Sequence, residues 1–108
     1  MSGFSLTPRA VARLAGIFEW TIERFGLPRA EAYCRDLLRR CTALASGSPP
    51  HGRSCEALLG KQADPADLYF YREGGHYIIY RKTEGRLIVI DFVHGARDLE
   101  GILKDLER

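Results

Sequence analysis

Four residues along the chain could act together on a phosphate group: Arg53, Arg81, His94 and Arg97. Cleavage of RNA without a metal ion needs a general base near the 2′-hydroxyl, a general acid for the leaving oxygen, and cations beside the phosphate. The arginines supply cations, His94 could exchange a proton, and Tyr80 lies next to Arg81. Because strand alternation sends Tyr80 and Arg81 to opposite faces, the set has no clear second acid or base. The sequence therefore favours a protein without catalytic activity of its own.

Ordinary structural roles are available to the same residues. His94 can form a hydrogen bond at a strand end, and Arg97 and Asp98 can pair locally or cap a helix. Arg81 can serve as the charge that protects an edge strand from aggregation, and Arg53 can tether a loop through backbone carbonyls. Both interpretations stay open at the level of sequence.

Other catalytic and ligand-binding motifs do not occur in the sequence. It contains no glycine-rich phosphate loop, carboxylate dyad, metal-ligand cluster or Ser/His/Asp order. Its three cysteines, Cys34, Cys41 and Cys55, fit no zinc spacing, and the first two share one face of a predicted helix. We expect small core residues in a reducing cytosol, and neither a metal ion nor a cofactor.

A run of β-forming residues between positions 68 and 98 must position Arg81 and His94. Tyrosine, isoleucine, valine and phenylalanine crowd three segments of it, and such side chains suit a pleated, half-buried surface. Glycines at 74–75 and 85 separate the segments and supply the positive φ that short hairpin turns need. The pattern predicts a three-stranded antiparallel meander.

The third segment predicts a central strand. Simple alternation places Ile88, Ile90, Phe92 and His94 on one face and Leu87, Val89, Asp91 and Val93 on the other. Both faces are mainly apolar, so we expect both to be covered for much of their length.

Two helices precede the sheet. Thr7 and Pro8 predict the start of the first and Gly26 its end. Its apolar stripe is Val11, Leu14, Ala15, Phe18, Ile22 and Phe25. Trp20 lies opposite that stripe, which indicates either a helix buried on two sides or an aromatic anchor for a partner.

The second helix begins at Pro28 and forms a hairpin with the first. Its apolar stripe is Ala30, Tyr33, Cys34, Leu37, Cys41 and Leu44. Residues 46–50 end it, and the connection to residue 67 is irregular. A short first strand over residues 3–6 and a last helix capped by Asp98 complete the order (β)ααβββα, which predicts an α+β fold with a helical hairpin on a small antiparallel sheet.

Composition indicates one soluble domain over residues 1–108. The 12.2 kDa chain is 45% apolar and 28% charged, and it has no apolar run long enough to span a membrane. We expect it to stay in the cytoplasm. The formal net charge of +2 is too small to argue for nucleic-acid binding, although residues 1–45 carry seven arginines against four carboxylates. That basic half suits an acidic protein partner or a nucleic-acid backbone, or is simply a solvated helix face.

Taken together, these residues resemble the ParE branch of the RelE/ParE toxins of type II toxin–antitoxin systems. The resemblance is carried by Leu6-Thr7-Pro8-x-Ala10, Trp20, Gly26, Ala32-x-x-Arg35, His51-Gly52-Arg53, His76-Tyr77-Ile78-Ile79-Tyr80-Arg81 and Val93-His94-Gly95-Ala96-Arg97-Asp98. The family usually has a second basic residue where this chain has Ala96.

The resemblance implies a bacterial toxin that a ParD-like antitoxin neutralises by direct binding. ParE toxins are known for inhibiting DNA gyrase, whereas the RelE branch cleaves messenger RNA on the ribosome, and a shared fold cannot choose between them. On this basis we expect Arg81, His94, Arg97 and the C-terminal helix to carry toxicity. Helical geometry gives Phe18, Trp20 and Tyr33 as antitoxin anchors and Arg13, Arg24 and Arg39 as partners for antitoxin carboxylates.

Overall fold

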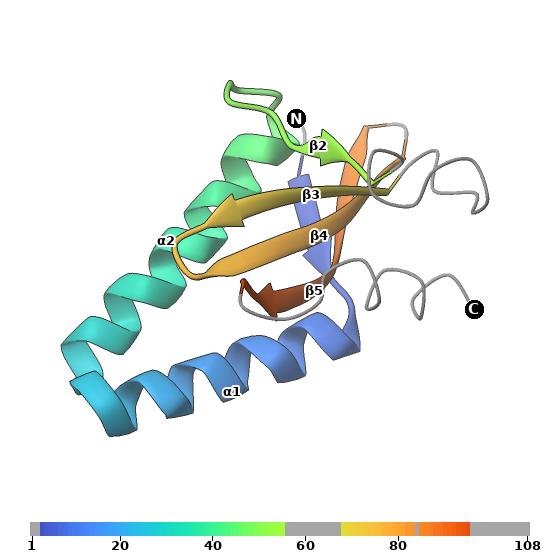
Figure 1. Ribbon diagram of the computed structural model, residues 1–108. Helices are drawn as coiled ribbons and strands as arrows, with labels where there is room; N and C mark the ends of the chain where they lie inside the picture. Colours follow the sequence, from blue (N-terminus) through green and yellow to red (C-terminus); the bar gives the residue numbers. More distant parts are fainter. Residues whose placement is uncertain (1–2, 56–67, 84, 96–108) are drawn as a thin grey trace.

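Two helices cover one side of a five-stranded sheet in the computed structural model, which describes residues 3–55, 68–83 and 85–95 (Figure 1). The elements in chain order are β1 (Gly3–Leu6), α1 (Pro8–Phe25), α2 (Leu27–Ala45), β2 (Arg53–Ser54), β3 (Leu68–Glu73), β4 (His76–Thr83) and β5 (Arg86–His94). The strand order across the sheet is β1-β5-β4-β3-β2. The predicted α+β architecture is therefore confirmed.

The antiparallel meander forms as predicted from β3, β4 and β5. Gly74 and Gly85 adopt φ of 60° and 70° in its two turns, a region that favours glycine. The sheet as a whole is mixed rather than antiparallel, because β1 pairs with β5 in parallel. The short strand β2 adds the fifth position by pairing with β3, within the connection that the sequence left irregular.

A β-bulge in β5 overturns the predicted alternation of its side chains. The register passes from Ile79 opposite Asp91 to Tyr80 opposite Val89, so Ile90 is an extra residue. The extra residue reverses the faces beyond it, and Leu87, Val89 and Phe92 all pack in one core cluster beneath the helices. A period of two cannot place both odd and even positions on one face without such a bulge.

The ends of α1 are those that the sequence predicts. The Thr7 side chain accepts a hydrogen bond from the Ala10 N–H at 3.1 Å, and Gly26 ends the helix with a φ of 92°. The predicted buried stripe is correct in part: Leu14 and Phe18 pack against the core, whereas Val11 is 52% exposed and Phe25 is 61% exposed. The prediction used hydrophobicity alone, and it therefore placed these two large apolar side chains in the core. The buried positions are Ala10, Ile17 and Thr21.

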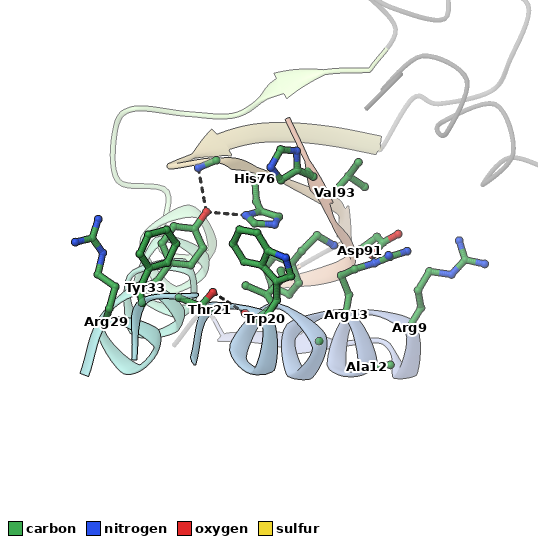
Figure 2. A pocket seen from close by; sticks show the side chains of 16 residues that line it. Arg9, Ala12, Arg13, Trp20, Thr21, Arg29, Tyr33, His76, Asp91 and Val93 are labelled. Carbon is green, nitrogen blue, oxygen red and sulfur yellow. Dashed lines mark hydrogen bonds and ion pairs between the residues drawn. The ribbon is translucent and has the colours of Figure 1, made fainter. Parts of the chain in front are cut away.

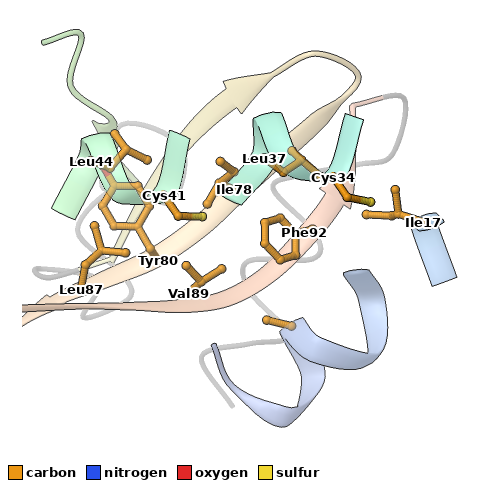
Figure 3. Close-up of a cluster of buried hydrophobic side chains, with 11 residues drawn as sticks. Ile17, Cys34, Leu37, Cys41, Leu44, Ile78, Tyr80, Leu87, Val89 and Phe92 are labelled. Atoms are coloured by element: carbon orange, nitrogen blue, oxygen red, sulfur yellow. The ribbon is translucent and has the colours of Figure 1, made fainter. Parts of the chain in front are cut away.

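The stripe of α2 forms the main core, as predicted. Figure 3 shows Cys34, Leu37, Cys41 and Leu44 lying over Ile78, Tyr80, Leu87, Val89 and Phe92 of the central strands. All three cysteines are buried and reduced, and burial raises the pKa of the Cys41 thiol to about 12. The cysteines are therefore packing residues, as the sequence indicates.

Polar contacts also hold the second helix, α2, against strand β3 of the meander. Arg40 Nε donates to Glu73 Oε1 at 2.8 Å, and its guanidinium lies over the Tyr71 ring. Tyr80 stacks on Tyr69 in the same layer, with 5.6 Å between ring centroids. The position of α2 over β3 and β4 is therefore fixed by charge as well as by the apolar core.

Some predictions fall on residues that the structure does not describe. Arg97, the Asp98 cap, the last helix and most of the connection between β2 and β3 lie outside the described residues. Of the helices that are described, none is long and apolar enough to cross a membrane.

Candidate binding groove

A groove of about 790 Å³ lies between α1, the start of α2, the β3–β4 turn and the end of β5 (Figure 2). Its walls combine aromatic and basic side chains. The aromatic members are Trp20, Phe25, Tyr33 and Phe92, and the arginines are Arg9, Arg13 and Arg29. Such a mixture suits a partner that is apolar on one side and acidic on the other.

Exposed aromatic rings dominate one end of the groove. Trp20 is 49% exposed, and its ring meets that of Phe25 edge to face at 6.2 Å. The guanidinium carbon Cζ of Arg24 lies 4.9 Å from the Trp20 ring centroid, and that of Arg29 lies 5.7 Å from the Phe25 ring centroid. Each ring therefore makes a cation–π contact with an arginine. Two large aromatic rings left this open are typical of a docking surface. The sequence left the role of Trp20 open, and its position favours an anchor.

A buried carboxylate forms the opposite wall. Asp91 is 1% exposed, and its Oδ1 accepts hydrogen bonds from Arg13 Nε at 3.2 Å and from the Phe92 N–H at 2.8 Å. The Arg13 side chain stays about half exposed, so its charge is also available to the groove. With Arg9 and Arg29, it gives the rim a positive balance over the single acidic lining residue.

The β3–β4 turn is held against α2 by the Tyr33 hydroxyl. The Gly75 N–H donates to this oxygen at 3.0 Å, and the oxygen lies 2.6 Å from His76 Nδ1 (Figure 2). Burial, followed by the nearby His94 and Arg13, lowers the pKa of His76 to about 4, so the imidazole is neutral at pH 7. Burial also raises the pKa of Tyr33, which keeps the phenol protonated.

One edge of β5 opens toward the groove. β1 pairs with residues 86–89, and Thr7 then bonds the carbonyls of Val89 and Ile90 at 3.0 and 2.8 Å. Among the described strands, none pairs with this edge of β5 beyond the bulge. The Phe92 N–H on this edge donates to the Asp91 carboxylate. It is therefore not available for a hydrogen bond to an added strand.

The antitoxin-binding residues predicted from sequence divide between two surfaces. Trp20, Tyr33 and Arg13 line the groove, and Arg24 covers the Trp20 ring. Phe18 and Arg39 instead line a separate shallow hollow on the outer side of the helical hairpin.

Sequence reasoning gave no binding role to most of the groove lining, including Phe25, Arg9 and Arg29. Phe25 had been assigned to the core, while Arg9 and Arg29 belonged to a basic half whose role was left open between a partner contact and a solvated helix face. Arg9 and Arg13 recur at a spacing of four residues on one helix, a signal that could have indicated a shared face.

Of the residues predicted to act on a target, those that the structure describes are not brought together. His94 lies opposite His76, whereas Arg81 lies five residues further along β4, roughly 17 Å away at about 3.3 Å per residue. Arg53 pairs with Phe70 across β2 and β3. Tyr80 is fully buried, and burial raises its pKa to about 12. This arrangement does not favour a shared catalytic centre at these positions.

Among the described residues, there is no group of three or more His, Cys, Asp or Glu side chains that could hold a metal ion. The groove, with its aromatic and basic lining, is therefore the main candidate site among these residues.

Fold and groove together define a class of small α+β proteins in which a helical hairpin on a mixed sheet leaves a groove lined by aromatic and basic side chains. Within this class the chain belongs to the ParE toxins. The model of the family described as ParE toxin of type II toxin-antitoxin system, parDE, matches residues 4–99. This membership confirms the family that the sequence motifs indicate.

Relatives and a solved structure agree with this assignment. Toxin ParE1 of Mycobacterium tuberculosis, in strains CDC 1551 / Oshkosh and ATCC 25618 / H37Rv, is 32% identical over 103 residues, covering 92% of this chain and 95% of the relative. A chain of the chromosomal ParDE TA system from P. aeruginosa superposes with a TM-score of 0.61. That match covers 87% of this chain and 96% of the other at 12% identity, so it speaks for the fold alone.

Proposed function

We propose that a ParD-like antitoxin neutralises this toxin by laying an amphipathic segment into the groove along α1. The observation that carries the proposal is the pair of half-exposed aromatic rings, Trp20 and Phe25, inside a groove with an arginine rim. A partner helix with apolar residues on one face would cover the rings, and carboxylates on its flanks would meet the arginines.

The length of the groove limits its occupant. The groove follows α1 from Arg9 to Phe25, which at about 1.5 Å per residue is roughly 24 Å. A partner helix of about 16 residues, or four to five turns, would fill it.

For the toxic activity, we propose inhibition of DNA gyrase by binding, without catalysis, in the cytoplasm. Family membership supports this target, and the separation of Arg81 from His94 supports a non-catalytic mode. Arg81, His94 and Arg97 remain our proposed target-binding residues. If they act together, they must do so as an extended contact surface, since His94 of β5 lies opposite His76 at one end of β4 and Arg81 lies near the other end.

The target is tested with purified, antitoxin-free protein in a gyrase supercoiling assay, in parallel with cleavage of messenger RNA in a translating extract. We expect loss of supercoiling or trapped cleaved DNA, with intact RNA. Codon-spaced RNA cuts with unaffected gyrase would instead place this chain with the messenger RNA endoribonucleases. A chain that affects neither and does not arrest growth would be a protein that only binds its antitoxin.

The groove is tested separately, by co-expressing the toxin with its cognate antitoxin and purifying the complex. We expect the double variant Trp20→Ala/Phe25→Ala to release the antitoxin. Phe18→Ala and Arg39→Ala, on the outer hollow, should retain it. The reverse pattern would move the antitoxin to the outer side of the helical hairpin.

A further inference from the structure

His76 lies at the start of β4 on the wall of the groove, and its contact with Tyr33 decides where its proton sits (Figure 2). The Tyr33 hydroxyl accepts a hydrogen bond from the Gly75 N–H at 3.0 Å and lies 2.6 Å from His76 Nδ1. Because burial raises the pKa of Tyr33, the phenol keeps its proton at pH 7 and donates it to Nδ1. The neutral imidazole then carries its own proton on Nε2, which makes this nitrogen a hydrogen-bond donor.

The immediate neighbours of His76 are positive or basic. His94 lies directly opposite on β5, with 5.3 Å between the two ring centroids. Burial first, and then the charges of His94 and Arg13, lower the pKa of His76 to about 4. Since like charges account for part of this effect, a negative group placed beside His76 would be stabilised there.

The single carboxylate of the groove lining does not supply that negative group. Asp91 is buried and already accepts hydrogen bonds from Arg13 Nε and from the Phe92 N–H. The Arg13 side chain is still 46% exposed, so it can meet a second anion from the groove side. The groups that face this part of the groove are Arg9 and Arg13 from α1, Arg29 and Tyr33 from α2, and Asp91 and His94 from β5.

We propose that the corner of the groove formed by His76, His94 and Arg13 binds the carboxylate of an aspartate or glutamate of the antitoxin segment. One oxygen of that carboxylate accepts from His76 Nε2, and the other accepts from the Arg13 guanidinium. The inference rests on the proposed antitoxin function. It adds the class of side chain that the segment carries opposite the start of β4.

A carboxylate in this corner changes the proton equilibrium of His76. An opposite charge at hydrogen-bond distance raises the pKa of an imidazole by about one to three pH units, so we expect about 6 in the complex against about 4 in the free toxin. The complex then takes up a proton as the pH falls through 6, and affinity should be about tenfold higher at pH 5 than at pH 8. Cover by apolar side chains alone would lower the pKa further, so the sign of the change separates the two cases.

The test is an NMR titration of the imidazole C–H signals, with histidine-labelled full-length toxin, free and in complex with its unlabelled cognate antitoxin. We expect the titration midpoint of His76 to rise by at least about one pH unit in the complex. His51, exposed on the loop after α2, is the internal control and should not change. A midpoint of His76 that is unchanged or lower in the complex would overturn the proposal.

Affinity measured by calorimetry at pH 5 and pH 8 gives a second readout. His76→Gln should lose the tenfold gain at pH 5, whereas Arg9→Gln, which removes a groove charge that does not titrate in this range, should weaken binding equally at both pH values. A full gain in His76→Gln would reject the site. If Trp20→Ala/Phe25→Ala retains the antitoxin, the groove itself is wrong. If that double variant releases the antitoxin while the His76 midpoint does not rise, only the carboxylate site is rejected.

Discussion

Arg13 of α1 and Asp91 of β5 form an ion pair in which Nε and Oδ1 lie 3.2 Å apart, with the carboxylate almost completely buried. The pair joins the first helix to the central part of the sheet, 78 residues further along the chain. A buried carboxylate that loses its partner keeps the cost of its desolvation, so the pair holds the groove wall in place.

We predict that Arg13→Met lowers the free energy of unfolding by about 2 kcal/mol, because Asp91 then retains only the Phe92 N–H. Urea unfolding measures the change. The exposed Arg9 on the same helix gives the matched variant Arg9→Met, expected within about 0.5 kcal/mol of the parent. Arg13→Met/Asp91→Asn should recover part of the loss, and a simple sum of the single effects would exclude coupling.

The aromatic rings of the groove should dominate antitoxin affinity. We predict that Trp20→Ala and Phe25→Ala each weaken binding by about 2 kcal/mol, or roughly thirtyfold, as buried aromatic anchors do. Val11 and Leu27 are equally exposed apolar residues that do not line the groove. Their alanine variants are therefore the controls, and a loss at them comparable to that at Trp20 would argue against a localised anchor.

The Tyr33 hydroxyl should contribute to stability as well as to the site. We predict that Tyr33→Phe lowers the free energy of unfolding by about 1–2 kcal/mol, because the Gly75 N–H and His76 Nδ1 lose their shared partner. Thermal and urea unfolding measure the change. Thr42→Ala removes an exposed hydroxyl bond to Leu38 and serves as the control, with an effect near zero. Unchanged stability in Tyr33→Phe would mean that water replaces the hydroxyl.

Gly52 lies directly over the Tyr80 hydroxyl. A methyl group at position 52 would overlap that hydroxyl and would lie 3.0 Å from the Phe70 carbonyl oxygen. We therefore predict that Gly52→Ala destabilises the protein by about 1–3 kcal/mol. Adding Tyr80→Phe should restore part of this loss, because it removes the overlapping atom. No restoration would show that the remaining close atoms, the ring carbon Cζ of residue 80 at 2.8 Å and the Phe70 carbonyl oxygen, are the obstacle.

Alkaline pH should unfold the protein through its buried core. An unfolded tyrosine loses its proton near pH 10, whereas burial raises the pKa of Tyr80 to about 12. The unfolded state therefore releases a proton that the folded state retains, and stability declines as the pH rises from 10 to 12, by about 2 kcal/mol at pH 12. Cys41, with a pKa of about 12, adds a decline that begins near pH 9. Urea unfolding across this range should be less steep in Tyr80→Phe, and an equal slope would contradict the assignment.

Local signals in the sequence account for most of the individual elements. Thr7 and Gly26 bound the first helix because side-chain capping and positive φ depend on neighbouring residues only. Gly74 and Gly85 place the two turns of the meander for the same reason. The stripe of α2 was predicted correctly because its larger apolar residues all face one core.

Predictions failed where two distant segments meet. The bulge at Ile90 reverses the faces of β5, and it depends on pairing with β4 rather than on local preference. The rotation of α1 depends on how closely Ala10 and Thr21 let it approach its neighbours, and neither residue is conspicuously hydrophobic. That rotation exposes Phe25 and so creates the aromatic end of the groove.

By itself, the sequence determined the order of the elements, the caps and turns, the packing face of α2 and the ParE family, because each rests on local chemistry or on motifs along the chain. Only the tertiary structure decided that Arg13 reaches Asp91, that Tyr33 bonds His76, and that His76 lies beside His94. These contacts join residues from 18 to 78 positions apart, and strand register and helix packing, which fix them, arise only when the whole chain is folded.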